Sequence, residues 1–259
     1  MVRSSGNPLG KYSAAPQATA RFVAQHLVMK PYIWSALSVH VHGERHLSDL
    51  SAPFIAVANH SSHLDSTVIF GALPRRLSRN LAAGAAADYF FKEKLKSVGT
   101  RLFFNAYPID RGGMRAHQGM SGKLLDDGVP LLIFPEGTRS RTGAMAKFKN
   151  GVAALSIQHH VPVLPIALVG AYAAMPYGQS MPIPGRPPVH VIFGTPQKAL
   201  PGESAPRFTT RLYNKVVELH DTTARAYGMP TQADFHRAVA LSEAARRREQ
   251  EPGSGTSAS

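Results

Sequence analysis

The sequence contains no cysteine. Disulfide bonds, thiolate metal ligands and a cysteine nucleophile are therefore excluded. The chain also lacks an uninterrupted apolar run of the roughly 20 residues that a membrane-spanning helix needs. Its N-terminal stretch, "MVRSSGNPLGKYSAAPQATA", has no apolar core of the kind found in signal peptides. We expect that, if this chain meets a membrane, it lies on the surface and does not cross the bilayer.

Acidic residues are scarce. Asp and Glu number 16 against 29 Lys and Arg, which gives a formal net charge of +13. A basic surface attracts phosphate, whether in nucleic acid, in an anionic membrane or in a phosphorylated substrate. No stretch interleaves aromatic and basic residues and no zinc-finger spacing occurs, so we expect no nucleic-acid partner. The composition, 44% hydrophobic and 17% charged, is typical of a globular chain with a sizeable core.

Short apolar segments alternate with amphipathic ones, which predicts strands alternating with helices. The predicted strands cover 38–47, 54–58, 129–134, 161–170 and 187–196. The predicted helices cover 64–73, 114–127, 150–160, 206–227 and 232–249, with strand, loop and helix over 81–103 and a turn-rich segment over 105–113. This alternation predicts an α/β fold with a mixed, largely parallel central sheet flanked by helices.

The predicted domain organisation has three parts. They are a flexible N-terminus with an amphipathic, membrane-proximal helix (1–37), an α/β domain (38–230), and a charged helix with a disordered tail (231–259). Within 18–37, apolar residues recur at spacings of three and four, which predicts a helix broken near Pro31. This helix carries the only tryptophan, Trp34. It either packs on the core or lies in a membrane interface, with its basic residues toward lipid headgroups.

Histidines are concentrated in the first predicted strand. His40 and His42 alternate with Val39 and Val41, so the two imidazoles share one face of the strand. No nearby arrangement of carboxylates supports a metal site there. We expect these histidines to face solvent.

The segment "NHSSHLD" (59–65) directly follows the apolar run "FIAVA". Open α/β sheets place their chemistry at the carboxyl ends of strands. His60 leaves the strand and Asp65 lies in the first turn of the following helix, so a turn between them can bring the carboxylate back to the imidazole. Asp65 would then hold one ring nitrogen as a donor and leave the other free to accept a proton. The two residues are a candidate general base and its orienting acid.

Other roles for this segment fit less well. His60, His63 and Asp65 are three possible metal ligands, but their spacing differs from the His-x-His-x-Asp-His pattern of metallo-hydrolases. Ser61 and Ser62 adjoin His60, but no Gly-x-Ser-x-Gly elbow occurs. Ser62 or Asp65 can also cap the following helix. We expect no metal site and no covalent acyl-enzyme, so that His60 acts directly on an acceptor hydroxyl.

The segment "FPEGTRS" (134–140) follows a second predicted strand. Backbone N–H groups around Gly137 and Thr138, with the guanidinium of Arg139, predict an anion-binding corner. Glu136 is expected to anchor the loop or to bind a substrate hydroxyl. The alternative is an Arg–Glu pair that only holds the turn.

A second candidate cation is Arg111, in "PIDRGG", beside flexible glycines. The alternative for Arg111 is a surface salt bridge with Asp110. The two polar segments, 59–65 and 134–140, both lie at the carboxyl ends of predicted strands. We therefore expect them to converge at one edge of the sheet.

Together these blocks resemble the glycerolipid acyltransferases of the lysophosphatidic-acid-acyltransferase type. "NHSSHLD" resembles that family's His-x4-Asp block, carried by His60 and Asp65. "NAYPIDR" resembles its second block, with Asn105 and Pro108 in place of the usual Gly and Phe, and "FPEGTRS" matches its third block without a change. "KFKNGVA" (147–153) is similar to the segment that follows the third block, and "VPVLPIAL" (161–168) is similar to the fourth block. The resemblance covers residues 39–194, and four blocks in the right order make it specific.

The resemblance implies that His60 deprotonates an acceptor hydroxyl while Asp65 keeps the imidazole oriented. The hydroxyl then attacks the thioester carbonyl of acyl-CoA or acyl-carrier protein. The thioester is a co-substrate, and no resident cofactor or metal is implied. The implied acceptor-binding residues, with the arginines on the acceptor phosphate, are Arg111, Glu136, Gly137, Thr138 and Arg139. The implied product is phosphatidic acid, made from lysophosphatidic acid on the cytoplasmic face of a membrane by a peripheral or monotopic enzyme.

Alternatives to this function stay open. An acyltransferase of the same family could act on another lysophospholipid, a glycolipid or a polyol, because acceptor shape is read by loops. A basic lipid-binding protein without catalysis would explain the charge, but it has no need of both His60 and Asp65. A metal-dependent hydrolase is the remaining possibility. The net charge of +13 fits an anionic membrane surface as a partner.

Overall fold

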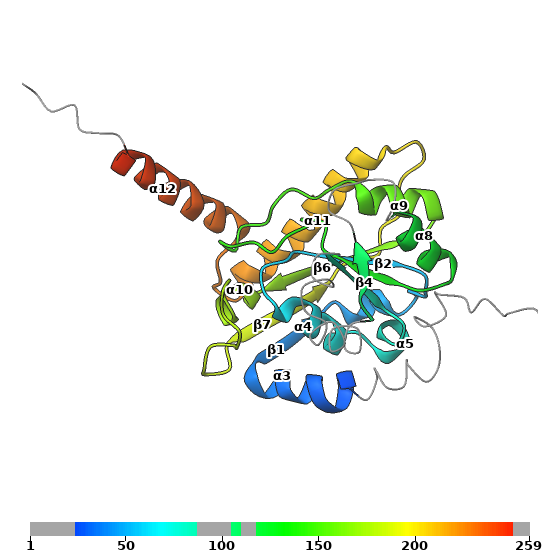
Figure 1. Ribbon diagram of the computed structural model, residues 1–259, viewed down its shortest axis with the longest axis horizontal. Helices are drawn as coiled ribbons and strands as arrows, with labels where there is room; N and C mark the ends of the chain where they lie inside the picture. The colour runs from blue at the N-terminus through cyan, green and yellow to red at the C-terminus, as the bar shows by residue number, and fades with distance from the viewer. Residues whose placement is uncertain (1–23, 87–104, 110–117, 251–259) are drawn as a thin grey trace, which may run out of the picture.

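The computed structural model describes residues 24–86, 105–109 and 118–250 of the 259-residue chain. Its centre is a seven-stranded sheet in the order β1-β7-β6-β2-β5-β3-β4 (Figure 1). Neighbouring strands are parallel except β6 and β7, which are antiparallel. The strands are β1 Ser38–His42, β2 Ile55–Ala58, β3 Ala82–Ala86, β4 Tyr107–Ile109, β5 Leu131–Ile133, β6 Val163–Val169 and β7 Pro188–Phe193. The predicted fold class is confirmed.

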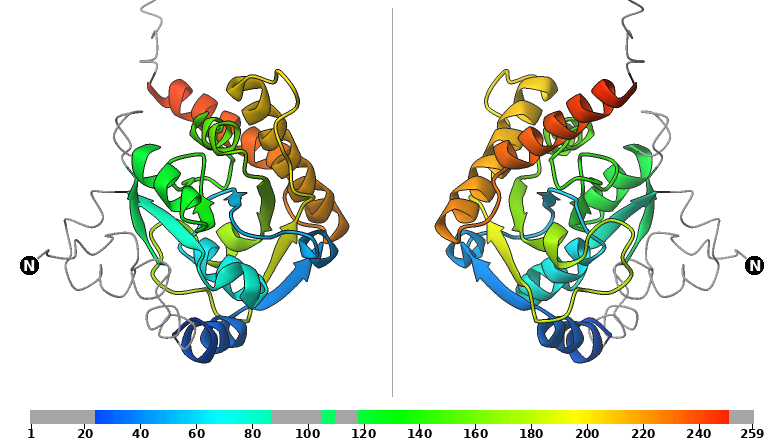
Figure 2. Two further views of the ribbon diagram at one scale, coloured as in Figure 1. Left: turned by 90° about the vertical axis from the view of Figure 1, so that its right-hand side faces the viewer. Right: turned by 90° about the vertical axis from the view of Figure 1, so that its left-hand side faces the viewer.

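Helices cover both faces of this sheet (Figure 2). The larger helices are α3 Lys30–Ala36, α4 Leu64–Ala72, α8 Gln118–Asp126, α9 Gly151–His159, α11 Ala205–Ala226 and α12 Gln232–Gln250. The shorter ones are the π-helix η1 Ala24–Met29, the 3-10 helix η2 Glu44–Leu47, α5 Arg75–Ser78 and α10 Ala171–Ala174. Ala56 and Ala58 join the core under α3 and α4, whereas Ile55 and Val57 join the core under α8, α9 and α11. Covered on both faces, the central strands are continuously apolar.

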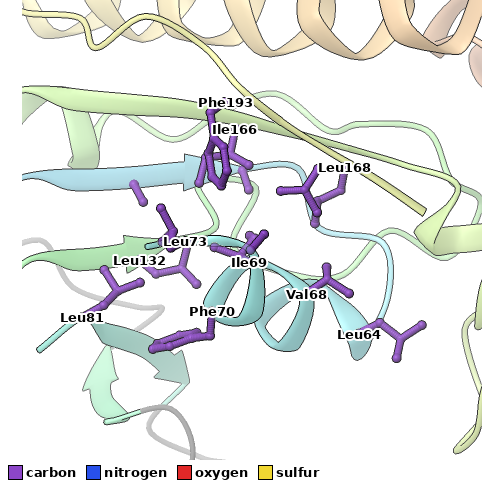
Figure 3. Packing of buried hydrophobic residues seen from close by; sticks show 14 of the residues in the cluster. Leu64, Val68, Ile69, Phe70, Leu73, Leu81, Leu132, Ile166, Leu168 and Phe193 are labelled. Carbon is purple, nitrogen blue, oxygen red and sulfur yellow. The ribbon is translucent and has the colours of Figure 1, made fainter. Parts of the chain in front are cut away.

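Helix α4 is fixed by its packing on the sheet, as Figure 3 shows. Its residues Val68 and Ile69 are fully buried in the same cluster as Leu132, Ile166 and Phe193. Full burial of such a side chain contributes about 1.5–3 kcal/mol. This packing fixes the first turn of α4, where the candidate orienting acid lies.

The last two helices have different surroundings. Helix α11 buries Phe208, Leu212 and Val216, spaced four apart, against the sheet. Helix α12 extends away from the rest of the molecule (Figure 1), and its residues 236–249 are half-buried or exposed. The charged helix predicted for this segment is confirmed.

Three local predictions need correction. Residues 107–109, predicted as part of a turn-rich segment, form β4 and pair with β3. The first strand ends at His42 and not at residue 47. Gly43 has a φ of 75°, and a Cβ on it would lie 2.1 Å from the carbonyl oxygen of Phe193, so only glycine fits this turn. The predicted cap of α4 also differs, because His63 occupies the N-cap position without a side-chain cap.

The N-terminal helical segment has two unlike faces. Its hydrogen bonding changes from π to α at Lys30, next to the predicted break at Pro31. Met29 and Ile33 are buried in the core, whereas Leu27 and Tyr32 are 68% and 48% exposed. Core packing, one of the two alternatives for this segment, is thus observed together with an exposed apolar face, and the position in a membrane interface stays a prediction. Among the helices of the described ranges, none has the length and apolar character needed to traverse a bilayer.

The histidines of β1 are only partly solvent-facing. His40 is exposed as predicted, but His42 is half-buried. Both rings stack on His190 of β7, with centroid distances of 4.9 and 5.2 Å, and His42 Nε2 lies 3.0 Å from His190 Nδ1. The register pairs His40 with His190 across the two strands, a contact that β1 alone cannot reveal.

Candidate active site

The two polar segments converge at one edge of the sheet. Strands β2 and β5 are adjacent and parallel, so the segments that follow them emerge side by side. The N–H of Ser140 donates to the carbonyl oxygen of His60 at 2.8 Å, which joins the two loops directly. The predicted convergence is confirmed.

His60 and Asp65 form a close pair. His60 Nδ1 lies 2.7 Å from Asp65 Oδ2, and the His60 side chain is 22% exposed while that of Asp65 is fully buried. Because a carboxylate only accepts hydrogen bonds, Nδ1 is the donor and Nε2 is left to accept a proton. The ring of Phe134 stacks on His60 at a centroid distance of 4.0 Å and an angle of 16°, which fixes the imidazole plane.

The loop between these two residues is tightly hydrogen-bonded. Asp65 Oδ2 also accepts the N–H groups of Ser61 and Ser62 at 2.7 and 2.9 Å. The hydroxyl of Ser62 accepts the N–H of Leu64 at 3.3 Å and donates to the carbonyl of Met175 at 3.0 Å. Both residues predicted as caps therefore satisfy N–H groups near the start of α4, although neither is at the N-cap position.

Asn59 fixes the end of β2 against β6. Its side-chain amide donates to the carbonyl of Leu168 at 3.0 Å and accepts the N–H of Leu168 at 2.8 Å. The residue immediately before His60 is thus held by both backbone groups of Leu168. Sequence reasoning did not single out Asn59, because an amide at a strand end is equally common in ordinary turns.

Glu136 is buried and its carboxylate binds backbone. Oε1 accepts the N–H of His60 at 2.6 Å and Oε2 accepts the N–H of Ala146 at 2.8 Å. These contacts favour the predicted loop anchor over the predicted substrate-hydroxyl ligand. Burial raises the pKa of Glu136 to about 7, with a smaller contribution from the charge of Asp65, against the opposing effect of the two N–H donors.

Cationic side chains gather beside this loop. Gly137 has a φ of 81°, and a Cβ on it would lie 2.6 Å from Lys149 Nζ, so the ammonium approaches the turn closely. The guanidinium carbons of Arg139 and Arg141 each lie 5.0 Å from the centroid of the Tyr177 ring. Sequence reasoning missed Arg141, Lys149 and Tyr177, since the chain is basic throughout and only the fold brings these residues together.

The remaining predicted site residues are placed as follows. The N–H of Gly137 donates to the carbonyl of Phe134 at 3.1 Å and closes the turn, and Thr138 is exposed. Arg111 and its alternative partner Asp110 lie outside the described residues. The acceptor-binding roles of Arg111, Gly137 and Thr138 stay predictions.

His63 lies close enough to Arg139 and His60 for their charges to act on it. It is exposed at the N-cap of α4. Partial burial lowers the pKa of His63, and the nearby charges of Arg139 and His60 lower it further. Within the part of the chain that the structure describes, no three His, Asp or Glu side chains are arranged to hold a metal ion.

Known proteins are similar to this chain in sequence. The model of the acyltransferase family matches residues 38–169, half of the chain. A 1-acyl-sn-glycerol-3-phosphate acyltransferase of Chlamydomonas reinhardtii is 31% identical over 70% of this chain and 53% of its own length. The bovine 1-acyl-sn-glycerol-3-phosphate acyltransferase alpha is 25% identical over 70% of this chain and 62% of its own length. The chain thus spans little more than half the length of these curated relatives.

A solved structure is similar to this chain in fold. The crystal structure of the 1-acyl-sn-glycerophosphate (LPA) acyltransferase PlsC from Thermotoga maritima aligns with a TM-score of 0.59 and 25% identity. The alignment covers 76% of this chain and 79% of that one, well beyond the sheet edge that carries the site. From the family match and this likeness in fold, the chain belongs to the acyltransferase family.

Proposed function

We propose that the protein transfers a fatty acyl group from a thioester donor to the free hydroxyl of lysophosphatidic acid, giving phosphatidic acid. The observation that carries this proposal is the 2.7 Å pair of His60 Nδ1 and Asp65 Oδ2 beside a cluster of cations. The curated relatives named above, whose names specify this acceptor, support it. Both acyl-CoA and acyl-carrier protein fit as donors, since each presents the same thioester.

In the proposed reaction, His60 Nε2 accepts the proton of the acceptor hydroxyl as the oxygen attacks the thioester carbonyl. The tetrahedral intermediate collapses by breaking the carbon–sulfur bond, and the imidazolium returns its proton to the leaving thiolate. Asp65 stabilises the transient positive charge on the ring without moving. General-base catalysis of this kind contributes roughly 10²–10⁴-fold to the rate.

The acceptor phosphate would bind the cations beside the loop after β5. Lys149 approaches the turn at Gly137, the charges of Arg139 and His60 both act on His63, and a guanidinium suits bidentate phosphate binding. Arg111 is proposed to add to this group from the segment outside the described residues. Binding the phosphate here would bring the nearby free hydroxyl of the glycerol within reach of the imidazole.

The apolar outer face of the N-terminal helix supports a peripheral position on an anionic membrane surface, at its cytoplasmic face. Leu27, Val28 and Tyr32 are exposed beside Lys30, whose ammonium lies 5.0 Å from the centroid of the Trp34 ring. Exposed apolar side chains next to basic ones are typical of interfacial helices. Such a position would let a lipid acceptor reach the site without leaving the membrane.

The test is acyl transfer from acyl-CoA to lysophosphatidic acid by the wild type and by His60→Ala, followed by mass spectrometry of the lipid product. We expect turnover to fall by about 10²–10⁴-fold in the variant. His159→Ala is the matched control, because His159 Nδ1 lies 2.7 Å from Asp126 in an equally short pair far along the chain from the site. Equal rates for the wild type and His60→Ala would refute the mechanism.

A panel of acceptors tests the substrate separately from the mechanism. Other lysophospholipids, glycolipids and polyols would be offered with one acyl-CoA. Preference for one of these, lost in His60→Ala, would keep the chemistry and correct the acceptor. Binding to anionic vesicles without transfer to any acceptor would instead favour the non-catalytic lipid-binding function.

A further inference from the structure

A chain of hydrogen bonds leads from the loop that carries His60 to the junction of α11 and α12. Neighbouring N–H groups of the loop after β5 are held from different elements: Ala146 N–H donates to Glu136 Oε2 at 2.8 Å, and Met145 N–H donates to Gln232 Oε1 at 2.7 Å. The other oxygen of Glu136 accepts the N–H of His60 at 2.6 Å. The backbone of the proposed base is thus connected to the first residue of α12 through two side chains and one short loop.

Gln232 is itself held firmly by α11. It is 3% exposed, and its N–H donates to Asp221 Oδ1 at 2.8 Å. His220 Nδ1 lies 2.9 Å from the same oxygen and must be the donor, which leaves His220 Nε2 to accept the Gln232 amide at 3.2 Å. A buried network in which every member has a partner specifies one geometry, and it is costly to leave half made. Gln232 therefore has little freedom to move away from Met145.

Apolar contacts from α12 hold the same loop at a second point. Gly143 has a φ of 84°, and a Cβ on it would lie 2.5 Å from the Phe235 ring, so the ring packs directly on the loop backbone. Tyr172 meets Phe235 edge-on at a centroid distance of 5.9 Å and donates its hydroxyl to the carbonyl of Arg141 at 3.2 Å. These contacts hold the loop at Arg141 and Gly143, two and four residues after Arg139.

We infer that Gln232, supported by His220, Asp221 and Phe235, is a positioning residue that sets the place of His60 and of the acceptor-binding cations. The family model ends at residue 169, so this junction lies outside the matched segment. The inference rests on the proposed function, because it assigns Gln232 a role in that reaction. The start of α12 would accordingly be part of the active site's support and not a solvated appendage.

The test compares Gln232→Met, which keeps the side chain's length and removes its hydrogen bonds, with Asp234→Ala. Asp234 accepts bonds from Thr231 at 2.6 and 3.0 Å at the start of α12 but is not bonded to the loop. We expect Gln232→Met to lower kcat about tenfold and to raise KM for lysophosphatidic acid while leaving KM for acyl-CoA unchanged. Asp234→Ala is expected to lower the unfolding temperature with kcat and both KM values unchanged.

Phe235→Ala is the second variant, and it carries the test if Gln232→Met does not fold. It removes the ring from Gly143 and is expected to give the same pattern, with kcat lowered and only the acceptor KM raised, at a smaller magnitude. A merely structural role would lower the unfolding temperature without this division between kcat and the two KM values, and that result would overturn the inference. Wild-type inactivity on every acceptor would refute the proposed function instead, whereas an active wild type with an unchanged Gln232→Met would refute only the positioning role.

Discussion

Two of the histidine–aspartate pairs among the described residues, those of His60 and His220, have nearly the same geometry and quite different surroundings. His60 Nδ1 lies 2.7 Å from Asp65, and His220 Nδ1 lies 2.9 Å from Asp221. The His60 side chain is 22% exposed at the sheet edge, whereas that of His220 is 3% exposed between α11 and α12. The second ring nitrogen of His220 accepts a bond from the Gln232 amide, whereas that of His60 is the proposed proton acceptor.

The difference shows that a short imidazole–carboxylate contact does not by itself make a base. Burial lowers the pKa of His220 even though Asp221 opposes that shift, so this ring stays neutral and keeps one tautomer for Gln232. In the proposed reaction the carboxylate performs the same orienting task at His60, and the second ring nitrogen exchanges a proton with the substrate. We therefore expect the His220 pair to serve structure and the His60 pair to serve the proposed chemistry.

The largest expected effect is on Asp65. Asp65→Asn presents either an amide N–H or an amide oxygen to Nδ1, so the imidazole no longer has a carboxylate to stabilise its protonated form. We expect kcat to fall by roughly 10²–10⁴-fold with the fold intact. The measurement is steady-state acyl transfer together with circular dichroism.

Asp126→Asn, in the surface pair with His159, is the control for Asp65→Asn and should keep its turnover. If Asp65→Asn also retained wild-type kcat, the functional contrast between Asp65 and the buried Asp221 would disappear.

A smaller effect is expected at Glu136, whose carboxylate binds the N–H groups of His60 and Ala146. Glu136→Leu leaves the N–H groups of His60 and Ala146 without an acceptor, and an unpaired buried donor costs about 1–3 kcal/mol. We expect the unfolding free energy to drop by roughly 2–4 kcal/mol in urea denaturation, since both donors lose their partner. Unchanged stability would mean that the two N–H groups find other acceptors.

The pH dependence of stability gives a second test of the burial of Glu136. Burial raises the pKa of Glu136 to about 7, so the folded state holds the proton more tightly than the unfolded state does. The resulting stabilisation is complete below the ordinary pKa range of glutamate and is lost as the pH rises toward 7. Glu136→Gln lacks this titration, so the wild type should lose stability relative to it between about pH 4.5 and 7. Parallel curves for the two proteins would contradict the raised pKa.

Sequence patterns predicted the parts of this molecule that depend on local order. The apolar runs 54–58 and 161–170 predicted the strands β2 and β6, because both faces of the sheet are buried there. The five-residue spacing of His60 and Asp65 predicted the pair, because a short turn before α4 brings the carboxylate back to the imidazole. The three-residue β4 was missed, because so short a strand is specified by pairing with β3 and not by periodicity.

The rest of the site depends on contacts between distant segments. Lys149 approaches Gly137 only because the loop after β5 folds back, and Gln232 reaches Met145 across 87 residues of sequence. Glu136 was considered a substrate ligand or an anchor, and its sequence surroundings could not distinguish the two roles. Its burial, with hydrogen bonds from the N–H groups of His60 and Ala146, results from contacts that only the fold brings together.

The last expected effect, no larger than the one at Glu136, concerns a histidine with no carboxylate partner among the described residues. His190 is fully buried in β7, with His40 and His42 of β1 stacked on it and the ring of Tyr227, at the end of α11, 4.1 Å away. Burial, with the added charges of His40 and His42, lowers the pKa of His190 to about 4. As the pH drops below the ordinary histidine pKa, His190 becomes protonated in the unfolded chain but stays neutral in the folded chain. The free energy of unfolding therefore falls as the pH drops from about 6.5 toward 4.

His190→Gln keeps a hydrogen-bonding group beside His42 and removes the titration. Over this pH window we expect the wild type to lose at most about 1.4 kcal/mol per pH unit more than the variant, because one proton is the most that a single imidazole contributes. The measurement is urea denaturation at half-unit steps of pH. A wild type no more acid-sensitive than His190→Gln would mean that His190 is protonated in the folded state, and the contrast with the carboxylate-paired histidines would then rest on His60 and His220 alone.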